Sequence, residues 1–151
     1  MNFKKILIIF FFFLQSCGFT PIYSNKDNQN ILISIENIRG DNQILYSLKS
    51  FLDRHITNNT GEAYILNLDI DYKKNSIGRN LTGQDIGYNL IAITKVSLKY
   101  QNINKNFEIT EKFTIDSFSN TNTEEEYIRS IKNNFAESIY QKIIQNILSI
   151  K

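Results

Sequence analysis

The chain has 151 residues, of which 42% are hydrophobic and 13% aromatic, with 17 basic and 15 acidic side chains. This length suits one compact domain, and the apolar content is too high for a disordered segment. The formal charge of +2 comes from Lys4 and Lys5, because 15 basic residues without them face 15 acidic ones. A near-neutral domain lacks the basic excess that neutralises phosphates, so we expect no nucleic-acid partner.

The first residues have the organisation of a signal peptide. Two positive charges, Lys4 and Lys5, precede nine successive apolar residues at 6–14. Nine helical residues rise only about 14 Å, roughly half of a membrane's hydrocarbon core, so this run is too short for a spanning helix. We predict that residues 1–16 are a signal peptide and are removed.

The residues around Cys17, the only cysteine, resemble the lipobox of bacterial lipoproteins. A branched apolar residue, Leu14, stands three places before the cysteine and a small one, Ser16, directly before it, although Gln15 departs from the usual small or aliphatic residue. The resemblance implies an S-diacylglycerol group and an N-acyl chain such as palmitate on Cys17, which together anchor a protein stably to a membrane. Gly18, rather than Asp, follows the cysteine, which favours the outer membrane over the inner one.

The mature chain is predicted to begin with a tether and then to fold. Residues 17–30 are mostly polar, contain the only proline and lack periodicity, which is typical of a linker. From residue 31 the pattern changes to a single α+β domain that extends to residue 151. Residues 31–36 alternate as a first strand, and from Asp41, a suitable N-cap, apolar residues recur at helical spacing as far as Ile56.

Three strands and a helix are predicted to follow. Residues 64–73 and 88–100 alternate between apolar and polar side chains, with a polar turn predicted over residues 74–83. A hairpin at 102–106 leads to a fourth strand at 107–115, in which Glu111 interrupts the apolar series and suggests a bulge.

The last helix is predicted to begin at a capping box, Thr123 to Glu126, and to run for about 40 Å towards the C-terminus. The expected order is therefore β-α-β-β-β-α. Two helices can cover one face of a four-stranded sheet, so we predict a two-layer α+β sandwich with a mainly antiparallel sheet.

The sequence offers little for catalysis or for metal binding. His55 is the only histidine, and catalytic triads and most zinc sites need a histidine beside a nucleophile or further ligands. Asp69 and Asp71 share one strand face and can form paired carboxylates or weak calcium ligands, or simply a solvated face. We predict no enzymatic activity, no catalytic residue, no metal site and no cofactor apart from the covalent lipid.

Five basic residues lie on or near the predicted second and third strands. They form a candidate site for the anionic headgroup of lipopolysaccharide, although a solvated polar face explains them as well. These residues are Lys73, Lys74, Arg79, Lys95 and Lys99.

Residues 17–23 read CGFTPIY and resemble the mature start of lipopolysaccharide-assembly lipoproteins, particularly alphaproteobacterial ones, where CGFxPLY is typical. The resemblance implies a small sandwich of two helices on a four-stranded sheet. It further implies a non-enzymatic outer-membrane lipoprotein that forms a plug inside the large β-barrel that inserts lipopolysaccharide, assists assembly of that barrel and binds lipopolysaccharide. Among the family's functional positions, only the lipidated Cys17 transfers to this chain.

Two other functions stay open at this point. An auxiliary lipoprotein of an intermembrane lipid-transport complex can also be a small α+β domain behind a lipobox. An exported hydrolase is disfavoured because histidines and nucleophile motifs are missing. Co-purification with an outer-membrane barrel or with an inner-membrane complex distinguishes the first alternative, and a loss of function on changing Ser97 or Asp71 alone supports the second.

Overall fold

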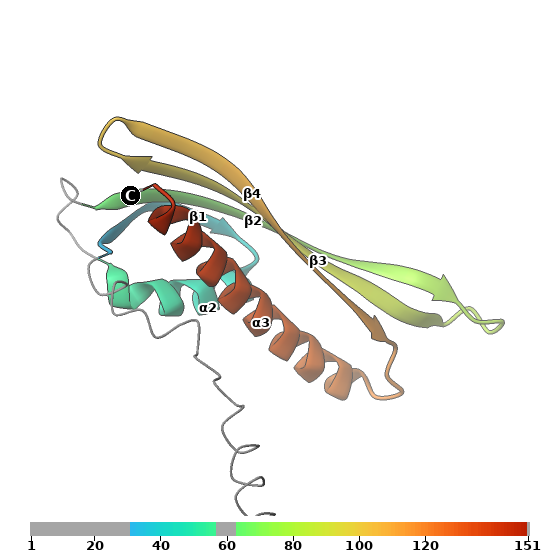
Figure 1. Ribbon diagram of the computed structural model, residues 1–151. Helices are drawn as coiled ribbons and strands as arrows, with labels where there is room; N and C mark the ends of the chain where they lie inside the picture. Colours follow the sequence, from blue (N-terminus) through green and yellow to red (C-terminus); the bar gives the residue numbers. More distant parts are fainter. Residues whose placement is uncertain (1–30, 57–62, 151) are drawn as a thin grey trace, which may run out of the picture. The chain divides into compact units, whose positions relative to one another are not determined.

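The computed structural model describes residues 31–56 and 63–150. The predicted signal peptide, Cys17 and the predicted tether lie outside these residues. The elements are β1 (Ile33–Gly40), α2 (Asn42–Leu52), the short 3₁₀ helix η3 (Asp53–His55), β2 (Tyr64–Arg79), β3 (Asp85–Tyr100), β4 (Ile103–Asp116) and α3 (Thr121–Leu148). Their order confirms the predicted β-α-β-β-β-α succession (Figure 1).

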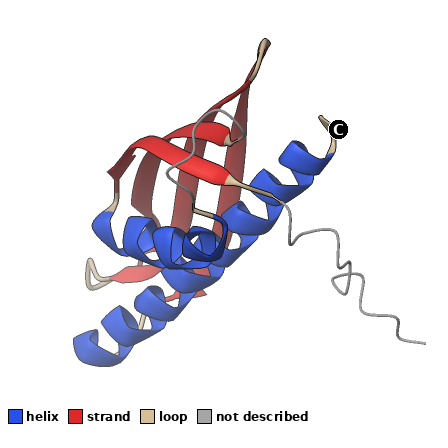
Figure 2. Cartoon of the chain, turned by 90° about the vertical axis from the view of Figure 1, so that its left-hand side faces the viewer, coloured by secondary structure: helices blue, strands red, loops and turns tan. Residues whose placement is uncertain are grey.

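The four strands form one mixed sheet in the order β1-β2-β3-β4. β1 runs parallel to β2, whereas β2, β3 and β4 are successively antiparallel. Both helices lie on the same side of this sheet (Figure 2), so the predicted two-layer α+β sandwich is confirmed. Within the described residues, neither helix is both long and apolar enough to cross a membrane.

The core lies between the sheet and the helices because alternate strand residues point towards the helical layer. Leu66 of β2 and Leu90 and Leu98 of β3 are fully buried there, and they meet Leu48 of α2 and Ile143 of α3. The intervening strand residues point to the opposite face, which we call the outer face.

The connection from β1 to α2 is tightly constrained. Gly40 adopts a φ of +124°, and a Cβ atom there would lie 1.9 Å from the carbonyl oxygen of Ile70. The next residue, Asp41, caps α2 as predicted, because its Oδ1 accepts hydrogen bonds from the backbone amides of Gln43 and Ile44, both at 3.1 Å. Only glycine fits at position 40, where the backbone has a positive φ and passes close to Ile70 directly before the helix cap.

β2 is longer than predicted. Residues 74–79, expected to form part of a turn, continue the strand and pair with β3 as far as Arg79 opposite Asp85, with register shifts on either side of Gly78 and no partner for Ile77. The chain reverses only after Arg79, where the side chain of Asn80 accepts hydrogen bonds from the backbone amides of Thr82 and Gln84. The predicted turn is therefore right for residues 80–83 and wrong for residues 74–79, because pairing between strands orders that mostly polar stretch and a hydropathy pattern does not register such pairing.

The start of α3 and the hairpin before β4 also differ from the prediction. α3 begins three residues early, because Asn120 caps it by accepting from the amides of Asn122 and Thr123. The predicted capping box at Thr123 therefore lies inside the helix. The hairpin before β4 is tighter than expected, with Gln101 at φ +51° and β4 beginning at Ile103.

The bulge predicted at Glu111 is wrong. β3 and β4 pair without a register shift, and Glu111 lies opposite Ala92. Its carboxylate points towards α3, where Oε1 accepts from Lys142 Nζ at 2.6 Å and from Ser138 Oγ at 2.8 Å. Glu111 can therefore occupy an inward-facing position of β4 without a bulge, because α3 supplies Lys142 as its cation.

Candidate functional site

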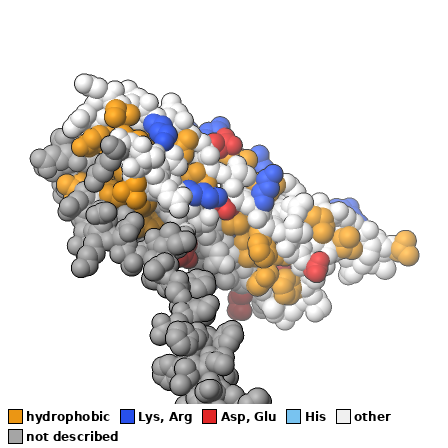
Figure 3. Space-filling view, in the orientation of Figure 1, with side chains coloured by type: hydrophobic (Ala, Val, Ile, Leu, Met, Phe, Trp, Pro, Cys, Tyr) orange, Lys and Arg blue, Asp and Glu red, His pale blue; other side chains and the backbone are white. Residues whose placement is uncertain are grey.

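The outer face of the sheet is the candidate functional surface, because neither helix covers it and most of the predicted site residues lie on it. On the view in Figure 3, lysine and arginine side chains lie among acidic and apolar ones and do not gather into one patch. The pairing registers of the strands give the arrangement of this face residue by residue.

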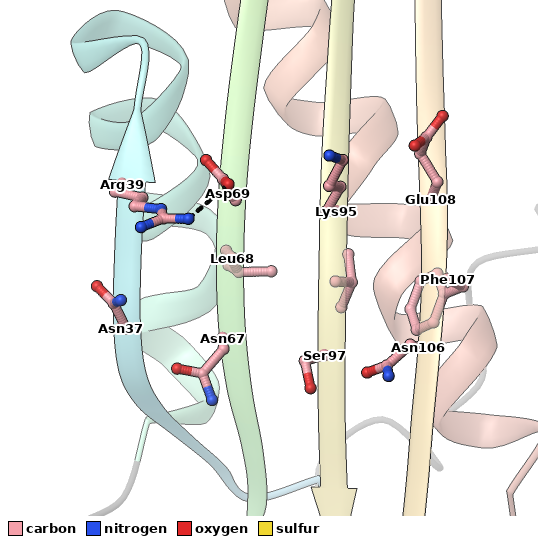
Figure 4. Close-up of a pocket in the computed structure, with 11 residues that line it drawn as sticks. Asn37, Arg39, Asn67, Leu68, Asp69, Lys95, Ser97, Asn106, Phe107 and Glu108 are labelled. Atoms are coloured by element: carbon pink, nitrogen blue, oxygen red, sulfur yellow. Dashed lines mark hydrogen bonds and ion pairs between the residues drawn. The ribbon is translucent and has the colours of Figure 1, made fainter.

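One row across the outer face alternates in charge. Each residue lies directly opposite the next on the neighbouring strand, and the row consists of Arg39, Asp69, Lys95 and Glu108 (Figure 4). Arg39 Nη2 lies 2.9 Å from Asp69 Oδ2, and this hydrogen bond and charge hold the pKa of Asp69 below its usual range. Opposite charges facing each other across strands favour this register of the sheet.

A second row runs parallel to the first and is uncharged. It consists of Asn37, Asn67, Ser97 and Asn106. The side chain of Asn67 donates to a carboxylate oxygen of Glu36 at 2.7 Å. The two rows border a shallow depression of about 580 Å³. Its lining contains positively and negatively charged side chains, uncharged hydrogen-bond donors and acceptors, and some apolar surface.

The structure places three of the five predicted basic residues on this outer face. Lys95 lies in the charged row between two acids. Lys99 lies four residues further along the same strand, about 13 Å away at the usual rise of a strand. Lys73 lies 3.0 Å from Asp71 in an exposed ion pair. Lys99 differs from Lys95 because its strand neighbours are Ile65 and Asn104.

The other two basic residues lie elsewhere. Lys74 faces the helical layer, where its Nζ lies 2.7 Å from Glu124 Oε1 and 3.8 Å from the centre of the Tyr88 ring. Arg79 lies near the end of the β2–β3 hairpin, 3.3 Å from Asp85. The five cations are therefore not brought together into one cluster.

The ion pair between Lys74 and Glu124 holds the first turns of α3 against β2. Burial raises the pKa of Glu124, but hydrogen bonds from Lys74 and from the backbone amide of Phe118 outweigh it, so the net shift is downward. The lowered pKa favours the ionised form of Glu124, which the ion pair needs. Because Lys74 is on β2 and Glu124 is on α3, Lys74 is part of the contact between the helix and the sheet.

The residues considered for catalysis have structural partners. Asp69 and Asp71 share the outer face, and they lie beside Arg39 and Lys73 respectively. His55 is buried, its Nε2 lies 3.1 Å from the hydroxyl of Tyr140, and burial lowers its pKa.

Sequence reasoning missed Arg39 and Glu108, the two ends of the charged row. Each is one of several charged residues in its own segment, and nothing local distinguishes it from other surface residues. The row exists only through the registers of three strand pairs, so a correct pairing of residues 39, 69, 95 and 108 is the signal that finds it.

The fold is similar to those of three solved lipoprotein structures. Rare lipoprotein B from Shewanella oneidensis has a TM-score of 0.63 at 13% identity, covering 79% of this chain and 98% of that one. A minor lipoprotein from Acinetobacter baumannii has a TM-score of 0.55 at 18% identity, covering 76% and 92%. An uncharacterized lipoprotein B from Nitrosomonas europaea has a TM-score of 0.53 at 13% identity, covering 75% and 83%. At these identities the similarity establishes a shared fold. No protein-family model and no curated protein matches the sequence.

Proposed function

We propose that this chain is a non-enzymatic outer-membrane lipoprotein that acts as plug and assembly partner of the β-barrel that inserts lipopolysaccharide into the outer membrane. The observation that carries the proposal is the coincidence of two independent features. The fold resembles lipoproteins of the rare lipoprotein B type, and residues 14–23 resemble a lipobox followed by the mature start of lipopolysaccharide-assembly lipoproteins.

The lipid on Cys17 provides the membrane attachment in this proposal. A thioether-linked diacylglycerol and an amide-linked acyl chain together bury enough methylenes for stable anchoring, which one chain does not achieve. The folded domain is then held at the periplasmic surface of the outer membrane or within the barrel lumen. Intact mass spectrometry of protein extracted from membranes tests this step, since Cys17→Ala should lack the lipid mass that the parent carries.

The chemistry of the outer face supports a role as a plug. The lumen of a large outer-membrane barrel is polar and water-filled, so a domain inside it needs a rigid core and a polar exterior. The charged row of Arg39, Asp69, Lys95 and Glu108 alternates in sign and is not strongly cationic. Such a face can form ion pairs and hydrogen bonds with a lumen wall of mixed charge.

Lipopolysaccharide binding is proposed for the outer-face lysines rather than for all five predicted cations. Lys99 is the strongest candidate for a phosphate contact, because its opposite neighbours Ile65 and Asn104 carry no charge, whereas Lys95 has an acid on each side. Lys74 is engaged by Glu124 on the other face. We expect Lys99→Glu to weaken binding of purified lipopolysaccharide more than Lys49→Glu, a matched change of an exposed lysine on α2.

Depletion of the protein in its native host tests the function as a whole. The proposal expects less lipopolysaccharide at the cell surface and a more permeable outer membrane, together with lower levels of the folded barrel. Unchanged surface lipopolysaccharide after depletion contradicts the proposal. Co-purification with an inner-membrane transport complex would instead favour the alternative role in intermembrane lipid transport.

A further inference from the structure

The free edge of β4 is long and regular. β4 pairs with β3 through 14 successive residue pairs, from Tyr100 opposite Ile103 to Gly87 opposite Asp116, without a register shift. No strand of the described chain lies on its other side. A long regular edge presents unpaired backbone amides and carbonyls, and it is a template for another strand.

The two edges of this sheet differ in protection. The opposite edge strand, β1, has eight residues and a register shift between Ile35 and Asn37. Short length and bulges are two common ways in which proteins blunt an edge. β4 has neither, and it contains no proline.

A third protective device is a charge that points inward from the edge strand, and β4 has two such residues, Glu111 and Lys105, each with a partner at α3 or its C-cap. Glu111 is ion-paired with Lys142 at 2.6 Å, and Lys105 donates a hydrogen bond to Ser149 Oγ at 3.3 Å. β4 also carries two exposed large hydrophobic side chains, Ile103 and Phe113, each 44% exposed. The edge therefore combines free backbone groups with uncovered apolar surface.

We infer that β4 pairs with β4 of a second copy of this chain, antiparallel and about a two-fold axis at Thr110. In this register Glu108 of each copy lies opposite Lys112 of the other, so the interface contains two cross-strand pairs of opposite charge. Phe107 lies opposite Phe113 of the second copy on the inward side. Both kinds of pair stabilise antiparallel strands.

Charge selects this register over its neighbours. Residues directly opposite in antiparallel pairing must share a face, so a symmetric register shifts by moving its axis from one residue to another. An axis at Glu108, Glu111 or Lys112 places that charged residue opposite its own copy. An axis at Ile109 places Glu108 opposite Thr110 and forms no pair of opposite charges.

The inference goes beyond the proposed function and does not rest on it, because it concerns only the edge of the sheet. Failure of dimerisation leaves the barrel proposal untouched. Equally, an absence of the barrel from pull-downs says nothing about the edge.

Charge reversal tests the pairing without depending on any ligand. The full-length protein is purified in a density-matched detergent, and its mass is measured by analytical ultracentrifugation up to about 100 µM. We expect the parent to dimerise, and we expect Glu108→Lys and Lys112→Glu to weaken the dimer on the order of tenfold each, because each places like charges opposite one another twice. Glu126→Lys, an equal charge change at the exposed start of α3, should dimerise as the parent does.

Mixing the two single variants gives the decisive outcome. A Glu108→Lys chain facing a Lys112→Glu chain restores both pairs of opposite charge, so the mixture should form a heterodimer although neither variant dimerises well alone. The double variant of one chain should also recover the dimer. A monomeric parent at all concentrations, or a mixture no more associated than its components, overturns the inference.

A disulfide at the proposed axis covers the case in which a charge variant fails to fold. Thr110 faces its own copy in this register, so Thr110→Cys should form an intermolecular disulfide on mild oxidation. Ser97→Cys, exposed on the adjacent strand β3, is the matched control, and the parent controls for Cys17. Cross-linking of Thr110→Cys no greater than that of Ser97→Cys overturns the pairing.

Discussion

Replacing Asp41 removes two interactions that depend on one carboxylate. Its Oδ1 accepts from the backbone amides of Gln43 and Ile44 at the start of α2, and its Oδ2 lies 2.6 Å from Lys132 Nζ of α3. The side chains of Asp41 and Lys132 are only 18% and 14% exposed. Lys132 also lies 4.0 Å from the centre of the Tyr72 ring of β2. Asp41 therefore joins both helices to the sheet.

The two interactions of Asp41 can be separated by the choice of substitution. Asp41→Ala loses the helix cap, which costs about 1 kcal/mol, and leaves a largely buried ammonium group without its anion, which costs about 1 to 3 kcal/mol more. We therefore expect a loss of about 2 to 4 kcal/mol in the free energy of unfolding. Asp41→Asn keeps a good cap and should lose about 1 kcal/mol less than alanine.

Urea denaturation of Asp41→Asn, Lys132→Met and the double variant measures the ion pair by itself. We expect the double variant to lose less unfolding free energy than the two single variants lose together, by about 1 kcal/mol or more. The reason is that the second substitution removes the charge that the first left unpaired. Additive losses within about 0.5 kcal/mol would refute the reasoning. Equal losses for Asp41→Asn and Asp41→Ala would refute the role of the cap.

Three further outcomes follow from local geometry and charge. In urea denaturation, Gly40→Ala should lower the free energy of unfolding by at least about 3 kcal/mol, because its Cβ would overlap the carbonyl of Ile70. Gly83→Ala has a φ of +81° but open space around it, so it should lower the free energy of unfolding by only about 1 to 2 kcal/mol. Equal losses for the two variants would contradict the steric explanation. Burial and the charge of Asp41 raise the pKa of Tyr72 from 10.0 to about 12. The folded state therefore resists ionisation, and its stability should fall as pH rises from about 10 to 12, a loss that Tyr72→Phe reduces. The pKa of Glu124 lies below its ordinary 4.5, so the stability from its pair with Lys74 is present above that pH and should be lost on acidification below it; Glu124→Gln should flatten this acid limb of the urea titration.

The parts of the fold that were predicted correctly are those in which burial of one face produces a regular spacing of apolar residues within a single segment. The alternation from Tyr64 to Tyr72 and from Tyr88 to Tyr100 assigns each residue of these strands to the correct face, because the inner face is packed by helices and the outer face is not. Asp41 was found as a cap because its neighbours start a helical repeat.

The parts that were missed depend on partners far away in the chain. The end of β2 was predicted as a turn because its residues are mostly polar, although all of residues 74–79 except Ile77 pair with β3. Glu111 was taken for a bulge because its partner, Lys142, lies 31 residues further on. The charged row through Arg39 and Glu108 likewise requires the register of the whole sheet, and no single segment contains it.

Cross-linking in intact cells followed by affinity purification from the envelope tests the central proposal most directly. The account predicts that the acylated protein brings down one large outer-membrane β-barrel in stoichiometric amount, and that Cys17→Ala brings down much less. Recovery of an inner-membrane transport complex in place of the barrel would contradict it.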